Sequence, residues 1–267
     1  MRKIFAFVVT GLLLVCCAHG QGDDAKAAEA GDSAWLKHFY LHPDEKPFDA
    51  FWKRVVKEKS LEDAEKVSTL MGFISQVLHR YPALIKGRLD GLDQFDEKER
   101  NLVCLLLWQS DTKEGRVVLE QNGKAELAAK PPLPIATWKI TDAGDLDYCW
   151  GYYFATGDTK ALDPILAALD WGKYAGAADK YKTSQKTAAD GDAALKDVLF
   201  QAAMWSLGAN GREDAGVLGY MEKAFSDPLA PKGRVMWVGV VLNKINPEKY
   251  KLELPEKKDS TGENGGN

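Results

Sequence analysis

The chain has 267 residues, of which 45% are hydrophobic and 28% charged, and its formal net charge at pH 7 is −4. It is long enough for one large domain or two small ones, and its charged fraction is ordinary for a soluble protein. Acidic and basic residues are mixed along the chain, so no single-sign field attracts nucleic acid or an anionic membrane, and we expect no nucleic-acid partner.

The first twenty residues have the pattern of a secretory signal peptide. Arg2 and Lys3 precede an apolar run over residues 4–15, and Ala18-His19-Gly20 offers small residues where a signal peptidase cleaves. We expect cleavage after this segment and an exported product, periplasmic or secreted. Cleavage takes away two of the 35 basic residues and none of the 39 acidic ones, which leaves a net charge of −6. No other stretch approaches the ~20 apolar residues of a transmembrane helix.

Two cysteines near the signal raise the alternative of a lipoprotein. A lipid-modified cysteine follows a small residue, but Val15 precedes Cys16, and Cys16 precedes Cys17. The pattern therefore disfavours a lipid anchor, which would tether the protein to a membrane instead of leaving it free.

Composition divides the remaining chain into one domain with flexible ends. Small and charged residues predict a flexible leader over 21–31, and a helical-repeat domain follows over 32–246. Within it, prolines predict an extended linker over 129–137, and residues 172–192 contain few large apolar side chains, which predicts a mobile or only marginally helical connection. The polar, Gly-rich residues 247–267 predict a disordered tail.

Helix start and stop signals mark the N-terminal half. Pro47 suits the first turn of a helix with a full apolar stripe. Residues 60–63 resemble a capping box that opens the next helix, and Pro82 breaks that helix. Asp96, with Glu99 three residues later, predicts the N-terminal cap of a third helix that is apolar nearly all round.

The strongest signal is a pair of helices over residues 145–171. Apolar residues from Leu146 to Phe154 recur at i, i+3, i+4, i+7 and i+8, as on one helix face. Gly157 can take the left-handed conformation that ends a helix, and Asp158 can cap the next. The segment predicts an αα-hairpin, which needs neighbours to bury both of its apolar faces.

Two other segments keep register with this hairpin. A shift of 47 residues aligns the turn within residues 107–113 with the central turn. A shift of 52 residues aligns Trp205 with Tyr153 at core spacing and places Asn210-Gly211 at a turn. Because these shifts are close to the ~40–47 residues of two-helix repeats, we expect an all-α stack of antiparallel helical hairpins, similar to an α-solenoid.

Catalytic motifs are absent from the sequence. It contains no Gly-x-Ser-x-Gly elbow, no Gly-rich phosphate loop, no His-Glu-x-x-His and no Cys-x-x-Cys. His38 and His42 are four residues apart, as in a helical metal site, but Pro43 pushes His42 out of helical geometry, which favours two surface histidines. We expect no catalytic residue, no metal site and no cofactor.

Three aspartates precede or open the central helix. Asp142, Asp145 and Asp147 lack the spacing and the terminal Glu of a calcium loop, so helix capping is the favoured role. A hydrolase built on scattered carboxylates is a less favoured alternative.

Two cysteines remain after cleavage of the signal. Cys104 and Cys149 both lie on apolar helix faces, and stacked helices in an oxidising compartment can bring two Cα atoms within the ~4.4–6.8 Å of a disulfide. Buried free cysteines are also common, so both states are open.

Aromatic residues have two possible roles. Trp52, Trp150 and Trp205 sit at core spacing, as for packing between helices. Trp138, Tyr152 and Trp171 lie beside the core face or near hairpin ends. These last three could line a groove for a sugar ring or a peptide, or they could be partly buried.

The pattern Trp150-Gly-Tyr-Tyr-Phe-Ala-Thr-Gly-Asp158, with Met204-Trp-Ser-Leu207 later, resembles exported bacterial proteins of helical-repeat type. More loosely, residues 35–246 resemble tetratricopeptide-like proteins, but their 34-residue period is not obeyed and no groove residue is carried over. The resemblance implies no activity. We expect a scaffold that binds another envelope or secreted protein, with a glycan or small-ligand binder as the alternative.

Overall fold

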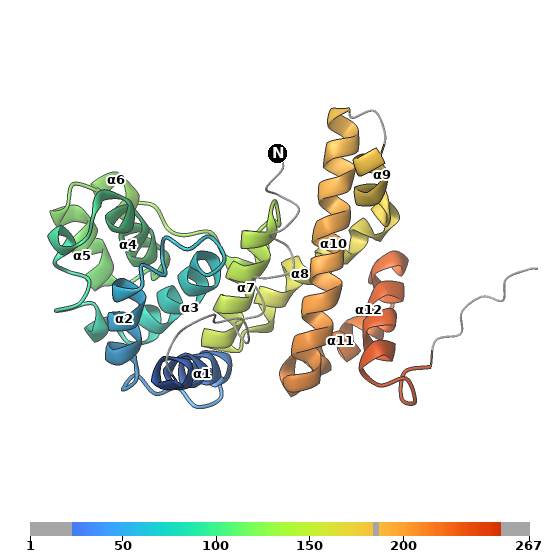
Figure 1. Cartoon of the computed structure of the whole chain (residues 1–267), viewed down its shortest axis with the longest axis horizontal. Coiled ribbons are helices and arrows are strands. Elements are labelled where there is room, and N and C mark those ends of the chain that lie inside the picture. The colour runs from blue at the N-terminus through green and yellow to red at the C-terminus, as the bar shows by residue number, and fades with distance from the viewer. Residues whose placement is uncertain (1–22, 184–186, 252–267) are drawn as a thin grey trace, which may run out of the picture.

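The computed structural model describes residues 23–183 and 187–251, and every regular element in these two ranges is a helix (Figure 1). The predicted all-α class is therefore confirmed. The predicted signal peptide lies outside the described residues, as does the predicted tail beyond residue 251. With η for short 3₁₀ helices, the elements are α1 (Asp23–His38), α2 (Phe48–Lys57), α3 (Val67–Arg80), η2 (Pro82–Leu84), η3 (Leu92–Gln94), α4 (Glu97–Gln109), α5 (Lys113–Gln121), α6 (Ala125–Ala128), η4 (Ile135–Thr137), α7 (Ala143–Thr156), η5 (Thr159–Leu162), α8 (Asp163–Ala168), η6 (Leu169–Tyr174), α9 (Ala177–Thr183), α10 (Ala188–Glu213), α11 (Ala215–Phe225) and α12 (Lys232–Ile245).

The turn between α7 and α8 follows the predicted local signals. Asp142 caps α7 and forms a reciprocal capping box with Asp145. Gly157 ends α7 with a φ of 68°, in the left-handed region that favours glycine. The Asp158 side chain then accepts a hydrogen bond from the Lys160 backbone amide at the start of η5. The chain thus reverses where the sequence predicts.

The crossing of α3 and α7 is the closest contact between two helices in the N-terminal half. A Cβ atom on Gly72 of α3 would lie 2.2 Å from the Tyr148 carbonyl oxygen. A Cβ on Gly151 of α7 would lie 2.1 Å from the Thr69 carbonyl oxygen. Since no side chain separates the two backbones at these points, only glycine fits at either position.

Helices α1, α2 and α3 meet in a cluster of aromatic side chains. Trp35 of α1 lies with its ring centroid 5.2 Å from that of Phe51 in α2 and 5.2 Å from that of Phe73 in α3. Phe39 packs edge-on against Phe73 at 5.4 Å. These edge-to-face and tilted arrangements place positive ring edges against negative ring faces and fix the three helices to one core.

Helix α3 contacts helices that are far apart in the chain. Helix α3 packs against both α4 and α7, and α4 packs against α5, so α3 lies between the α4–α5 hairpin and α7 (Figure 1). The finer description of the fold as successively stacked hairpins is therefore not confirmed.

The C-terminal group is arranged around α10, which contacts η6, α8, α9, α11 and α12 (Figure 1). The predicted turn at Asn210-Gly211 is wrong, because both residues are buried inside α10. A Cβ on Gly211 would lie 2.4 Å from the Met221 methyl carbon and 3.0 Å from Ile245 Cδ1. This glycine lets α11 and α12 approach α10, and the chain turns only at Asp214.

Two of the three tryptophans predicted to lie in the core do so. Trp52 and Trp150 are buried, whereas the Trp205 side chain is 45% exposed. The repeat register that aligned Trp205 with a core position fails, because α10 continues past the predicted turn.

A polar junction joins the C-terminal group to the N-terminal one. The Tyr40 hydroxyl donates to Asp214 Oδ2 at 2.8 Å, and the Tyr153 hydroxyl donates to Asp214 Oδ1 at 3.0 Å. Oδ1 also accepts from the backbone amides of Gly216 and Val217, which caps α11. One carboxylate thus connects the turn after α1, the last turn of α7 and the start of α11.

Several segments expected to be irregular are helical or packed. Helix α1 already begins at Asp23, in an Ala-rich stretch of high helix propensity, where we expected a flexible leader. In the expected connection over 172–192, η6 ends, α9 forms and α10 starts, with residues 184–186 outside the described part. Tyr250, in the first part of the expected tail, packs against the core.

The capping box expected over 60–63 is absent, because α3 starts only at Val67.

Within residues 23–183 and 187–251, no helix is both long enough and apolar enough to cross a membrane.

Candidate functional site

The three aromatic residues predicted to line a groove are not brought together. The Trp138 ring stacks on Tyr148 with centroids 4.4 Å apart, and its indole nitrogen donates to Asp145 Oδ1 at 2.9 Å. Tyr152 is half-buried on α7, and burial raises the pKa of its hydroxyl. Trp171 lies in η6, which packs against α10 and α12. No ring contact joins any two of the three in the described part of the chain.

The two candidate disulfide cysteines are free. Cys104 lies in α4 and Cys149 in α7, on either side of α3, and both side chains are buried. Burial raises the pKa of the Cys104 thiol, and it raises that of Cys149 to about 12. Both thiols therefore stay protonated near neutral pH and serve as small apolar groups in the core.

The two spaced histidines lie at the surface. His38 ends α1, and the His42 amide donates to the His38 carbonyl oxygen in the following turn. Both residues are exposed. Within the described ranges they belong to no group of three metal-binding side chains.

Asp147 is a carboxyl group with a strongly raised pKa. It lies half-buried on α7, and no hydrogen bond or ion pair joins its side chain to another described residue. Burial, and secondly the negative charge of Asp142, raise its pKa to about 7. A hydrolase of the two-carboxylate type needs a second acid across a cleft, and the Asp147 carboxyl makes no hydrogen bond to another acid among the described residues.

Asp147→Asn is expected to stabilise the protein at pH 8 by about 2–4 kcal/mol and to change little at pH 4. The unfolded chain ionises this carboxyl near pH 4, whereas the folded chain holds the proton until about pH 7. The wild type therefore loses stability as pH rises through this interval, and the asparagine variant does not. Urea unfolding at pH 4, 6 and 8 tests this, and parallel pH profiles of the two proteins would contradict it.

A surface hollow of about 440 Å³ lies where α11 turns into α12. Its lining is mainly apolar, with one lysine and one aspartate at its edge. The lining residues are Phe225, Ser226, Asp227, Pro228, Ala230, Lys232, Val235 and Met236.

The turn beside the hollow presents Leu229 to solvent. Pro228 and Pro231 flank the turn and restrict its backbone. Asp227 Oδ1 accepts a hydrogen bond from the Leu229 amide at 2.9 Å. The Leu229 side chain is 92% exposed in this conformation, and Met236 of α12 is 50% exposed. We call Phe225, Leu229 and Met236 the C-terminal apolar patch.

This patch was not predicted from the sequence. An apolar residue between two prolines was the available signal, because proline favours turns and turns run over the protein surface.

Comparison of the chain with known proteins finds no matching family model, no matching curated protein and no matching solved structure. Its function has to be inferred from its own residues.

Proposed function

We propose that this protein is exported and acts without catalysis, as a helical scaffold that binds another envelope or secreted protein through the C-terminal apolar patch. The observation that carries the proposal is the exposure of Leu229 and Met236 beside a hollow lined by Phe225. Large apolar side chains gathered around one concavity are typical of surfaces that bind other proteins.

The energetics of the patch favour a protein partner. Full burial of a side chain such as Leu229 contributes about 1.5–3 kcal/mol. The turn is already held by two prolines and by Asp227, so binding costs little additional backbone entropy. Lys232 and Asp227 at the edge of the hollow can pair with polar groups around an apolar anchor.

A binding role is also in keeping with the other candidate residues. No two of the Trp138, Tyr152 and Trp171 rings are in contact with each other, and the Asp147 carboxyl makes no hydrogen bond to another acid in the described ranges. These observations favour a protein partner over a glycan and over carboxylate hydrolysis.

Leu229→Asp and Met236→Asp are each expected to weaken capture of the partner at least tenfold, since a carboxylate cannot enter an apolar contact without losing its hydration. The measurement is a crosslinked pull-down of the tagged mature protein from its native envelope or secretion fraction, quantified by mass spectrometry. Leu133→Asp is the matched control, because Leu133 is 65% exposed but lies between α6 and η4, outside the patch.

Three outcomes are decisive for the proposal. A stoichiometric partner kept by wild type and Leu133→Asp, and lost by both patch variants, supports it. Recovery of the protein alone, or a partner that all variants keep, contradicts it. The same mass spectra report the N-terminus, and a chain that still begins at Met1 would contradict export without affecting the binding role.

A further inference from the structure

The C-terminal apolar patch places an apolar projection beside an apolar hollow on one surface. The Leu229 side chain is 92% exposed and does not line the hollow, whereas Phe225 and Met236 do. A twofold axis brings the same surface of two copies together, so a projection next to a hollow is complementary to itself. Leu229 of one copy can enter the hollow of a second copy while the second copy's Leu229 enters the first.

Two charges of opposite sign flank Leu229 along the turn. Asp227 precedes it and Lys232 follows it, and both are exposed at the edge of the hollow. Asp227 Oδ1 accepts from the Leu229 amide, but neither Asp227 nor Lys232 forms an ion pair with another described residue. A twofold axis through the turn reverses the direction of the chain, so Asp227 of each copy faces Lys232 of the other. The charges of this surface are therefore complementary to themselves as well.

The position of Lys232 is not explained by its own helix. It is the first residue of α12, and no acidic residue lies in the first turn of that helix. A cation there faces the positive end of the helix dipole, where anions are favoured. A carboxylate from a second copy compensates this unfavourable position.

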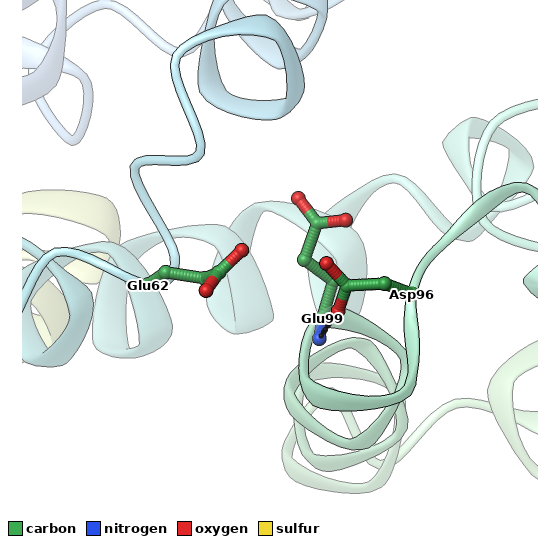
Figure 2. Close-up of side chains that lie close together, drawn as sticks. All are labelled: Glu62, Asp96 and Glu99. Atoms are coloured by element: carbon green, nitrogen blue, oxygen red, sulfur yellow. Dashed lines mark hydrogen bonds between the residues drawn. The ribbon is translucent and has the colours of Figure 1, made fainter.

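Another exposed lysine shows the alternative, which is pairing within one copy. Figure 2 shows the carboxylates of Glu62, Asp96 and Glu99 together at the start of α4. The Lys59 ammonium lies 2.9 Å from an oxygen of Glu62 and 2.9 Å from an oxygen of Asp96, although its side chain is 58% exposed. Lys232 pairs with no acid in the described part of its own copy, and its ammonium is available to another molecule.

We propose that two copies of this protein cover each other's C-terminal apolar patch, with Leu229 of each in the hollow of the other and Asp227 of each beside the opposite Lys232. Such a dimer, an inference that rests on the proposed function, occupies the patch while the partner is absent. Three apolar side chains bury less than the roughly 800 Å² per subunit of a stable interface, so the dimer is weak, with Kd on the order of 10⁻⁵–10⁻⁴ M. It gives way to a partner that binds the same patch more tightly.

The test is sedimentation velocity of the purified mature chain over a concentration range that spans this Kd. Wild type is expected to shift from monomer to dimer and not to larger species, because an isologous contact closes on itself. Leu229→Asp should raise the Kd at least about tenfold, since a carboxylate loses its hydration in an apolar hollow. Leu133→Asp is the matched control, because Leu133 is 65% exposed and lies outside the patch.

A double-mutant cycle separates twofold pairing from non-specific apolar association. Lys232→Glu places a second carboxylate opposite Asp227 of the other copy and should raise the Kd about tenfold. Asp227→Asn keeps a side-chain oxygen for the Leu229 amide but removes the charge. Combined with Lys232→Glu, it should therefore regain most of that loss. Added salt should narrow the difference between wild type and Lys232→Glu.

The possible outcomes distinguish this dimer from the proposed function. A wild type that stays monomeric over the whole range overturns the dimer, as does self-association that Leu229→Asp leaves intact. Equal weakness of Lys232→Glu with and without Asp227→Asn overturns it as well, and circular dichroism of each variant establishes that it is folded. A monomer that still captures a partner in the pull-down contradicts only the dimer, and a dimer that captures none contradicts only the proposed function.

Discussion

Gly72→Ala and Gly151→Ala are each expected to lower the free energy of unfolding by at least about 3 kcal/mol. The new Cβ would lie 2.2 Å or 2.1 Å from a backbone carbonyl oxygen of the facing helix. A flexible side chain could move aside, but a helix backbone cannot, so α3 and α7 must separate and loosen the packing along their crossing. Chemical denaturation followed by tryptophan fluorescence measures the loss, which corresponds to a fall in Tm of roughly 6 °C or more.

Gly219→Ala is the control for this pair. Gly219 lies inside α11, and nothing lies within 4 Å of the position that its Cβ would occupy. Alanine there removes conformational freedom from the unfolded chain and should stabilise by about 0.4–1 kcal/mol. If all three variants lost similar stability, the effect would not come from the crossing of α3 and α7.

Asp214→Ala is expected to cost about 3 kcal/mol or more. It removes the cap of α11, worth about 1 kcal/mol, and it leaves the buried Tyr153 hydroxyl without its carboxylate acceptor, which costs a further 1–3 kcal/mol. The Tyr40 hydroxyl loses its acceptor as well. Because these bonds connect the two halves of the molecule, amide hydrogen exchange should accelerate in α11 and α12 before it does in α3.

Thr187→Ala provides a matched comparison. Thr187 caps α10 through a hydrogen bond from the Asp190 amide, and its hydrogen bonds to described residues all stay within the same turn. Its loss should cost only about 1 kcal/mol, as for an ordinary cap. Equal losses for Asp214→Ala and Thr187→Ala would mean that the Asp214 junction contributes nothing beyond capping, contrary to our expectation.

The elements that could be predicted from sequence are those fixed by near neighbours. The apolar stripe behind Pro47 forms α2, and Asp96, Asp142 and Gly157 act as helix cap and stop residues where expected. Capping joins residues two or three apart, and a helix face repeats every three or four, so both signals are complete within a short window.

The errors come from residues whose role depends on distant partners. Gly211 has the sequence pattern of a turn, but α11 and α12 approach α10 there, and the glycine provides room within the helix. Trp205 was placed in the core by a repeat register that the longer α10 does not follow. The extent of helix at residues 23–31 was also missed, since small residues are compatible with both helix and coil.

The sequence by itself determined that this protein is all-α and where several helices start or stop, at Asp96, Asp142 and Gly157, because those properties depend on interactions within a few residues. Only the tertiary structure decided that α3 lies between α4 and α7, that Asp214 receives two tyrosines, and that Glu62 lies beside Asp96 and Glu99. These contacts join residues that are distant along the chain, and the way the helices pack on one another determines which of many possible pairs meet.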